Sequence, residues 1–392
     1  MISSATFRPE GSKQRTLYVH IPFCRNRCGY CNFSLLTGRD DLIDRFLDAL
    51  AIEIGWLEKR QTVETIFLGG GTPSHLNRQQ LLRLFEIIDT RFNILEGAEI
   101  SVECNPNDLD KDLVETFAKC GINRVSLGVQ SFQPAKLKFL ERTHDAQDIE
   151  SAVVFARNLT ENISFDLIFG TPGETVEQWL EELGRAEEFA PKHLSTYELT
   201  IEKGTDFWNR HSKKQFSVPG DDRRAEIYQA TIDFLCSHGF GHYEISSFSK
   251  PGYECRHNQS YWDGSDYFAF GPGAARYIDG IRETNHRSTT TYIKRIESGL
   301  SPIAEQEEMT KREQAIDRIV FGLRQLAGFD LNQFEMATGC DAIELMGSQG
   351  KKMVQNSLLE IVDGRCKMTS SGLMFYDSIC ELIVHQNDVK LV

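Results

Sequence analysis

Between residues 17 and 199 the sequence alternates short β-rich runs with longer stretches of helical periodicity, and this alternation limits the possible folds more than any other feature. Runs rich in β-branched and aromatic residues predict strands at 17–21, 65–70, 99–104, 124–129, 163–170 and 193–199. Helices are predicted between them at 41–59, 78–92, 109–120, 148–158 and 175–188. Such alternation forms a parallel sheet with crossover helices, either a partial barrel or an open doubly wound sheet. Both place ligand chemistry at the carboxyl ends of the strands.

The second half of the chain has a different pattern. A helix is expected at 221–238. The Gly/Tyr/Trp-rich composition of 243–276 predicts loops and short strands that surround a bound group. Charged helical repeats follow at 311–326, 331–337 and 342–349, and then two short strands around Asp363-Gly364 and a closing helix, which resemble a small winged-helix-like unit. We therefore expect a core domain at 10–245, a loop-rich extension at 246–305 and a helical domain at 306–392.

Composition excludes some classes of function. The 392 residues carry a formal net charge of -14 without any Lys/Arg block, which argues against nucleic acid as the main partner. No stretch approaches the roughly 20 apolar residues that cross a bilayer, and the first residues lack the apolar segment of a secretory signal. We expect a cytoplasmic protein, in which most of the ten cysteines are isolated, reduced and buried. Peripheral membrane association stays open.

Three cysteines differ from the rest because they lie within eight residues, directly after the first predicted strand. Cys24, Cys28 and Cys31 have the spacing C-x3-C-x2-C, which can hold three corners of an iron–sulfur cluster. The alternative is a structural zinc site, for which His20 could supply the fourth ligand. His20 lies on the preceding strand, however, where neighbouring side chains point to opposite faces. If the cluster is 4Fe-4S, one iron has no protein ligand. That iron can bind an amine and a carboxylate, as reductive cleavage of S-adenosylmethionine (SAM) requires.

This spacing resembles the radical SAM superfamily. The family pattern has an aromatic residue before the third cysteine, here Tyr30, and a glycine-rich segment after the second strand that meets the methionine end of SAM, here Gly69 to Pro73. Glycines allow a positive φ and a close approach of the backbone to a ligand. The resemblance implies an α/β fold, a partial (β/α)6 TIM-like barrel of the radical SAM type with a C-terminal helical, winged-helix-like unit.

More closely, the chain resembles the branch that contains oxygen-independent coproporphyrinogen III oxidase and the HemW-type heme chaperones. LYVHIPFC, VECNP, SLGVQSF, LERTH, FDLIFGTPGET and YEISSFSKPG all carry this resemblance, which covers nearly the whole chain. It implies that the cofactors are contacted by Tyr18, Tyr30, Gly70, Gly71, Thr72, Glu103, Gln130, Arg142 and Asp166. Carboxylates can accept from ribose hydroxyls or the amino group, and Arg142 can pair with the SAM carboxylate. Two of these residues also have a simpler interpretation, in which Asp166 caps a helix and Arg142 is a solvated charge.

This chain differs from the oxidase pattern in two features, and both favour the chaperone group. The oxidase pattern has a further cysteine two positions after the third, where this chain has Phe33, and a longer N-terminal segment than the 23 residues that precede Cys24. HNQSYW (257–262) resembles the HNxxYW motif of the HemW group, which makes His257 a candidate heme ligand, although a hydrogen-bonded histidine in an aromatic core is the alternative. We also expect an aromatic surface that covers the macrocycle, formed by Tyr253, Tyr261, Trp262, Tyr267 and Phe268.

The resulting hypothesis is a HemW-type chaperone that uses a 4Fe-4S cluster and SAM, binds heme as cargo and transfers it to client apo-hemoproteins. An electron donor such as a flavodoxin or a ferredoxin is the further partner that such a cluster implies. The main competing enzyme activity is oxidative decarboxylation of coproporphyrinogen III in porphyrin biosynthesis. Radical methylation, heme-ring opening and a plain zinc-binding module also stay open.

Overall fold

The core of the computed structural model, which describes residues 15–387, is a row of six parallel strands that follow one another in chain order. They are β1 (Arg15–Ile21), β4 (Gln61–Gly70), β5 (Phe92–Cys104), β6 (Arg124–Gln130), β7 (Ile163–Phe169) and β8 (His193–Glu198). Consecutive strands are neighbours, which is the order of a (β/α) barrel and differs from that of a doubly wound sheet. The sheet ends at β14 and β9 without closing, so the predicted partial barrel is confirmed.

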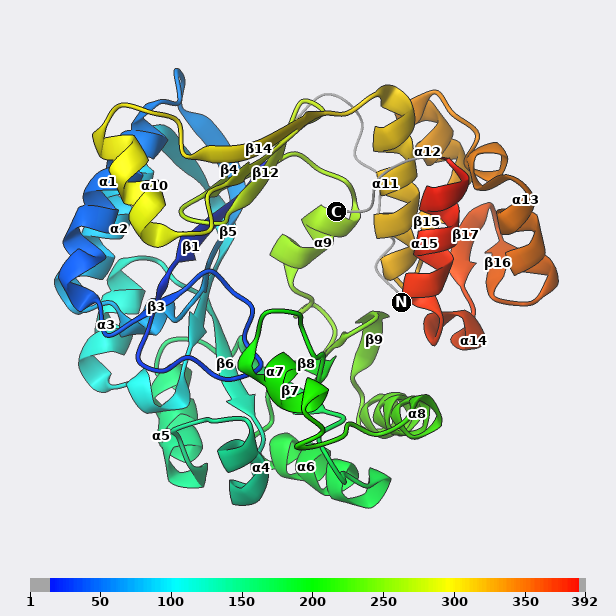
Figure 1. The fold of residues 1–392 in the computed structure, drawn as a ribbon, viewed down its shortest axis with the longest axis horizontal. Helices are drawn as coiled ribbons and strands as arrows, with labels where there is room; N and C mark the ends of the chain where they lie inside the picture. Colours follow the sequence, from blue (N-terminus) through cyan, green and yellow to red (C-terminus); the bar gives the residue numbers. More distant parts are fainter. Residues whose placement is uncertain (1–14, 388–392) are drawn as a thin grey trace.

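The crossover helices cover the outside of this curved sheet, as Figure 1 shows. They are α1 (Ile43–Gly55), α2 (Arg78–Arg91), α3 (Lys111–Lys119), α5 (Ala146–Arg157) and α6 (Val176–Glu188), with the short α4 (Pro134–Phe139) ahead of α5. Their starts follow local capping rules: Asn77, Asp145 and Thr175 each accept from the backbone at the third helical position in a capping box. Three 3-10 turns lie at Asp40–Leu42, Pro73–His75 and Pro106–Asp108.

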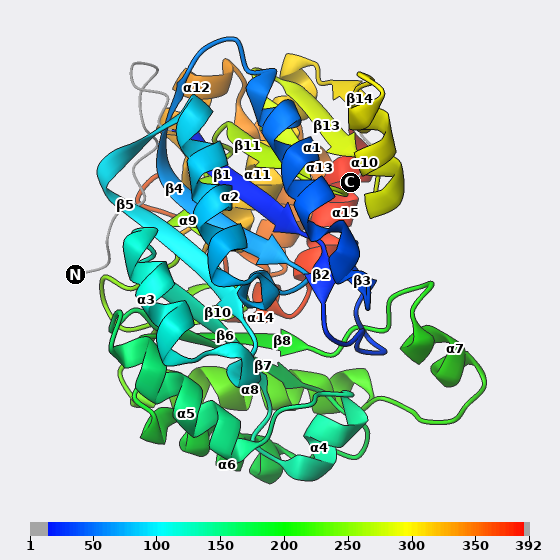
Figure 2. The same cartoon turned by 90° about the vertical axis from the view of Figure 1, so that its left-hand side faces the viewer.

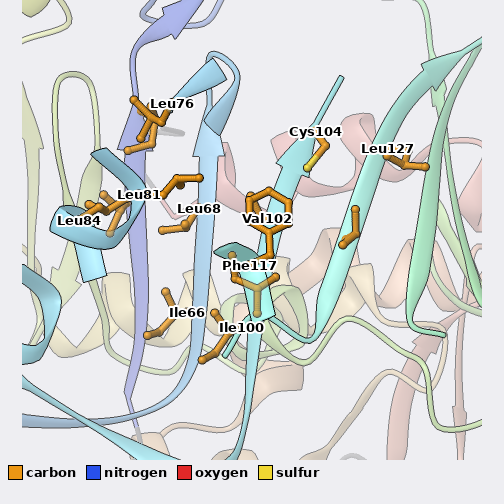
Figure 3. Packing of buried hydrophobic residues seen from close by; sticks show 14 of the residues in the cluster. Ile66, Leu68, Leu76, Leu81, Leu84, Ile100, Val102, Cys104, Phe117 and Leu127 are labelled. Carbon is orange, nitrogen blue, oxygen red and sulfur yellow. The ribbon is translucent and has the colours of Figure 1, made fainter. Parts of the chain in front are cut away.

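Apolar side chains fill the space between sheet and helices. Figure 3 shows Leu81 and Leu84 of α2 beside Ile66 and Leu68 of β4, and all four are fully buried. Full burial of such a side chain contributes about 1.5–3 kcal/mol. The strands that carry the predicted site residues therefore rest on a densely packed layer.

The segment after β8 extends the same sheet at both edges. It contains α7 (Asp206–Ser212), α8 (Asp221–Ser237), β9 (Gly241–Glu244), β10 (Ser247–Ser249), α9 (Arg256–Trp262), β11 (Tyr267–Phe270), β12 (Ala275–Ile278), β13 (Ile281–Asn285), α10 (Thr289–Glu297) and β14 (Ile303–Glu308). β11 pairs parallel with β1, and β10 pairs antiparallel with β8. A buried carboxylate, Glu53 of α1, accepts from the Gly271 N–H, the Asn285 amide and the Tyr292 hydroxyl, and so fixes this extension to the barrel.

Helix α9 lies where the sequence predicts only loops and short strands. Its first backbone N–H groups, those of Arg256 and His257, donate to the carboxylate of Glu99 on β5. A capping group more than 150 residues away in the sequence leaves no local signal. The helix that carries the HNQSYW motif was therefore missed.

The C-terminal unit has a hydrophobic core of its own. Its elements are α11 (Lys311–Arg324), β15 (Phe329–Asp330), α12 (Leu331–Thr338), α13 (Ala342–Gln355), β16 (Leu359–Val362), β17 (Arg365–Met368), α14 (Ser370–Leu373) and α15 (Tyr376–Gln386). β16 and β17 form the predicted hairpin, with Asp363 and Gly364 both at positive φ as its tight turn requires. Figure 1 shows α11 facing α9, and Figure 2 shows α7 projecting from the barrel.

The division of the chain at 245 and 305 stays a prediction, and residues 10–14 and 388–392 of the outer two domains lie outside the described part. Within residues 15–387 no helix is long and apolar enough to span a membrane.

Candidate functional site

A single cavity of about 1010 Å³ opens at the carboxyl ends of the parallel strands. It brings together the predicted cluster and SAM residues from seven separate segments of the chain. Its lining includes Tyr18, Cys24, Cys28, Tyr30, Cys31, Gly70, Gly71, Thr72, Glu103, Gln130, Arg142 and Asp166. Their convergence follows from the fold, because parallel strands end on the same edge of a sheet.

The three cysteines lie on a loop between two very short paired strands, β2 (Phe23–Cys24) and β3 (Leu36–Thr37). Cys24 Sγ shares a hydrogen bond of 2.8 Å with Thr72 Oγ1, and Cys28 Sγ is 3.6 Å from Arg142 Nη1. The Cys31 N–H donates to the Cys28 carbonyl, which turns the loop back on itself. Burial raises the pKa of the Cys24 and Cys31 thiols, so positive charge close by is needed before they ionise.

No three His, Cys, Asp or Glu side chains within residues 15–387 converge on a position for one metal ion. A cluster does not require such convergence, because each thiolate binds a different iron. His20, which would be the fourth ligand of a zinc site, is occupied: its ring nitrogens hydrogen-bond to the Ser34 carbonyl at 2.7 Å and the Tyr18 hydroxyl at 3.0 Å. The donor set therefore fits a cluster better than a tetrahedral zinc ion.

The glycine-rich segment after β4 runs against the cysteine loop. The Gly71 N–H donates to the Ile21 carbonyl and the Thr72 N–H to the Phe23 carbonyl, both at 2.8 Å. A Cβ at Gly71 would lie 2.6 Å from the Phe23 carbonyl oxygen, and one at Gly70, where φ is 110°, would lie 2.6 Å from the His20 ring. Only glycine allows this approach of the two backbones.

Two carboxyl groups lie on the strands beneath the cavity. Glu103 accepts from the Gly70 N–H at 3.0 Å, and Asp166 accepts from the Ser126 hydroxyl at 3.1 Å, on a neighbouring strand and not at a helix cap. Burial and the adjacent charge of Asp166 raise the pKa of Glu103 to about 8. Burial raises the pKa of Asp166 too. The pair can accept hydrogen bonds and offers a favourable place for a cationic group such as an ammonium.

Arg142 contacts three separate segments of the chain. Its Nη2 donates to Asn105 Oδ1 at 2.5 Å and to the Gly128 carbonyl at 3.0 Å, while Nη1 faces Cys28. Its buried Nε has no hydrogen-bond partner within residues 15–387. The side chain is thus held in the cavity wall rather than solvated.

Gln130, on the same wall, has a φ of 62°, which is uncommon for a residue with a side chain. Asn105 was not singled out from the sequence, although it directly follows the third strand within VECNP. It accepts from Arg142 and donates to Thr72, so it connects both sides of the cavity.

Comparison with known proteins places these features in a family. Residues 18–186 match the model of the radical SAM superfamily, and residues 309–375 match the HemN C-terminal domain. The heme chaperone HemW of Lactococcus lactis is 34% identical over 94% of this chain and 97% of its own. That of Synechocystis is 38% identical over 92% of this chain and 94% of its own. The chain belongs to the HemW-type branch of the radical SAM superfamily.

Membership in this superfamily implies a 4Fe-4S cluster and SAM as cofactors. A solved structure described as coproporphyrinogen III oxidase (HemN) from Escherichia coli has a similar fold, with a TM-score of 0.82 at 23% identity, covering 95% of this chain and 90% of that one.

The HNQSYW motif meets the cavity through its last two residues. Tyr261 and Trp262 line the cavity, together with Tyr267, Tyr197 and Phe321 of α11. Tyr253 and Phe268, which were expected on this aromatic surface, are not part of the lining. Phe268 is buried against Phe92 on the other side of β11. Phe321 was missed because only the packing of α11 against α9 brings it here.

His257 does not line the cavity. It is fully buried, with Nδ1 2.8 Å from Thr65 Oγ1 and Nε2 2.8 Å from the Tyr261 hydroxyl. Burial lowers its pKa to about 3, which keeps the ring neutral. Both nitrogens are engaged, so His257 has the contacts of the hydrogen-bonded core histidine. Its role as an iron ligand stays a prediction that requires one of these bonds to break.

Proposed function

We propose that this chain is a heme chaperone, which holds a 4Fe-4S cluster and SAM at the strand ends, binds heme in the same cavity and transfers it to apo-hemoproteins in the cytoplasm. The observation that carries the proposal is the extent of the similarity to proteins described as heme chaperones, which spans more than nine tenths of both chains. The make-up of the cavity agrees with it.

In this proposal Cys24, Cys28 and Cys31 would hold the cluster, and SAM would bind next to it. When bound, such a cluster would supply the reducing chemistry for SAM, with a flavodoxin or a ferredoxin as the electron donor. Arg142 would bind the SAM carboxylate with its unused Nε, and Glu103 and Asp166 would accept from its amino or ribose groups. Gly70, Gly71 and Thr72 bring the backbone close enough to contact the ligand, and Tyr18, Tyr30 and Gln130 complete the wall.

The cavity has room beyond these cofactors. At about 1010 Å³ it is at the upper end for a ligand pocket, and the part formed by β8, α9, β11 and α11 has a largely aromatic lining. Aromatic side chains cover a flat macrocycle well, because buried apolar area stabilises a complex by about 25 cal/mol per Å². Phe33, in the position of the oxidase's additional cysteine, is 61% exposed. This arrangement supports heme as the cargo.

The test uses anaerobically reconstituted protein with cluster, SAM and reductant. We expect about four irons and four sulfides per chain in the cluster, saturable binding of one heme, and no conversion of coproporphyrinogen III to protoporphyrinogen IX. Catalytic release of CO2 from coproporphyrinogen III would contradict the chaperone proposal and favour the oxidase. Iron-free protein with one tightly bound zinc would contradict both.

A further inference from the structure

On the proposed function, a side chain at the cavity binds the heme iron. Tyr261 of the HNQSYW motif lines the cavity, and its hydroxyl is held in place by a hydrogen bond. Its Oη is 2.8 Å from His257 Nε2, and His257 Nδ1 is 2.8 Å from Thr65 Oγ1. The three side chains form a hydrogen-bonded line from β4 to the cavity.

His257 is fixed at the buried end of this line. Its backbone N–H donates to Glu99, its ring packs 5.2 Å from that of Phe67, and its exposed fraction is 1%. To reach an iron in the cavity the imidazole would have to break its bond to Tyr261 and displace the phenol ring. Tyr261, in contrast to His257, already lines the cavity.

We propose that Tyr261 supplies the oxygen that binds the iron of a ferric porphyrin, and that His257 is a positioning residue for this oxygen. Tyrosine is an established axial ligand of heme iron. On binding, the phenol O–H bond breaks, its proton leaves to solvent, and an oxygen–iron bond forms, while the iron stays ferric. His257 stays neutral: Thr65 donates to Nδ1, and Nε2–H donates to the phenolate oxygen. No oxidant or reductant is required.

The surroundings of Tyr261 suit a porphyrin plane. The Tyr267 ring lies 4.7 Å from the Tyr261 ring at a steep angle, and Trp262 and Phe321 continue the same wall. The buried Trp262 Nε1 has no hydrogen-bond partner within residues 15–387, and we infer that a propionate carboxylate would accept from it. A phenolate ligand and a nearby neutral donor together match the two polar features of a ferric porphyrin: its cationic iron and its carboxylates.

The experiment compares the full-length, reconstituted wild type with Tyr261→Phe, Tyr267→Phe and His257→Gln in ferric heme titrations, with resonance Raman spectra of each complex. Tyr267→Phe is the matched control, because it removes a hydroxyl from the adjacent cavity residue. We expect phenolate–iron vibrations in the wild type, Tyr267→Phe and His257→Gln. Tyr261→Phe should lose them and bind heme at least about tenfold more weakly. Comparable SAM binding in all four proteins checks that each is folded.

Wild-type heme complexes with imidazole–iron and no phenolate–iron vibrations would overturn the proposal without any variant. An unchanged spectrum and affinity in Tyr261→Phe would do the same. In both cases the chaperone function stands, since heme is still bound. A wild type that binds no heme would overturn the proposed function and this inference together.

Discussion

Replacing Lys136 by methionine should be among the most destabilising single changes in the barrel. Lys136 Nζ lies 2.5 Å from Glu174 Oε1 and 3.1 Å from Glu182 Oε1, and all three side chains are at least nine tenths buried. Glu182 accepts from the Phe132 N–H, and Glu174 accepts from the Gly170 N–H. The ammonium group thus ties α4 to the loop after β7 and to α6.

The expected loss in the free energy of unfolding follows from the two carboxylates that the substitution leaves unpaired. Lys136→Met keeps most of the volume but leaves two buried carboxylates without a cation. Removing one partner of a buried ion pair costs about 3–5 kcal/mol, because the remaining charge is neither solvated nor paired. The ammonium is also 4.8 Å from the Trp179 ring, a contact worth about 0.5–2 kcal/mol. The methionine stem keeps part of the packing, so we expect a net loss of about 3–5 kcal/mol in the free energy of unfolding.

Urea denaturation followed by far-UV circular dichroism measures this loss. The matched control is Lys138→Met, an exposed lysine on the same helix, for which we expect a change within about 0.5 kcal/mol. Changing Glu174 and Glu182 to glutamine in the Lys136→Met background should recover part of the loss, because the uncompensated charges are removed. A loss below about 1 kcal/mol for Lys136→Met, or no recovery in the triple variant, would refute the reasoning.

Three further predictions concern the cofactor sites. Alanine at Cys24, Cys28 or Cys31 should remove the visible absorption of the cluster and abolish SAM cleavage; full iron loading in the triple variant would contradict their assignment. Arg142→Ala should weaken SAM binding by about 1.5–3 kcal/mol in calorimetry while cluster iron is unchanged. Because the pKa of Glu103 is raised to about 8 and the positive sulfonium of bound SAM would lower it, SAM binding should release a proton. Affinity should therefore rise with pH up to about 8, and Glu103→Gln should flatten this dependence; a flat wild-type profile would place the positive charge of SAM away from Glu103.

The strands and crossover helices were predictable because their signals are local. Apolar runs, helical spacing and capping residues lie within each element, as Asn77 and Thr175 illustrate. The meeting of the cysteine loop, the glycine segment, Glu103 and Asp166 was also predictable, since parallel strands present their carboxyl ends on one edge.

What could not be predicted depends on contacts between distant parts of the chain. Glu99 caps α9 from a strand, Glu53 fixes the extension to α1, and Phe321 reaches the cavity from the C-terminal unit. The orientation of the His257 ring also depends on a contact with a distant part of the chain. Sequence spacing places it on a helix with Tyr261, but only the packing against Thr65 determines that its ring faces the core.

Heme transfer tests the central claim most directly. Wild-type protein with cluster and SAM is loaded with one ferric heme and mixed anaerobically with a b-type apo-hemoprotein, and after separation the absorption spectrum of each protein is recorded. The account predicts that heme leaves this chain and appears in the acceptor with the acceptor's own spectrum, and that coproporphyrinogen III is not converted under the same conditions. A chain that binds no heme, but catalytically releases CO2 from coproporphyrinogen III, would contradict it.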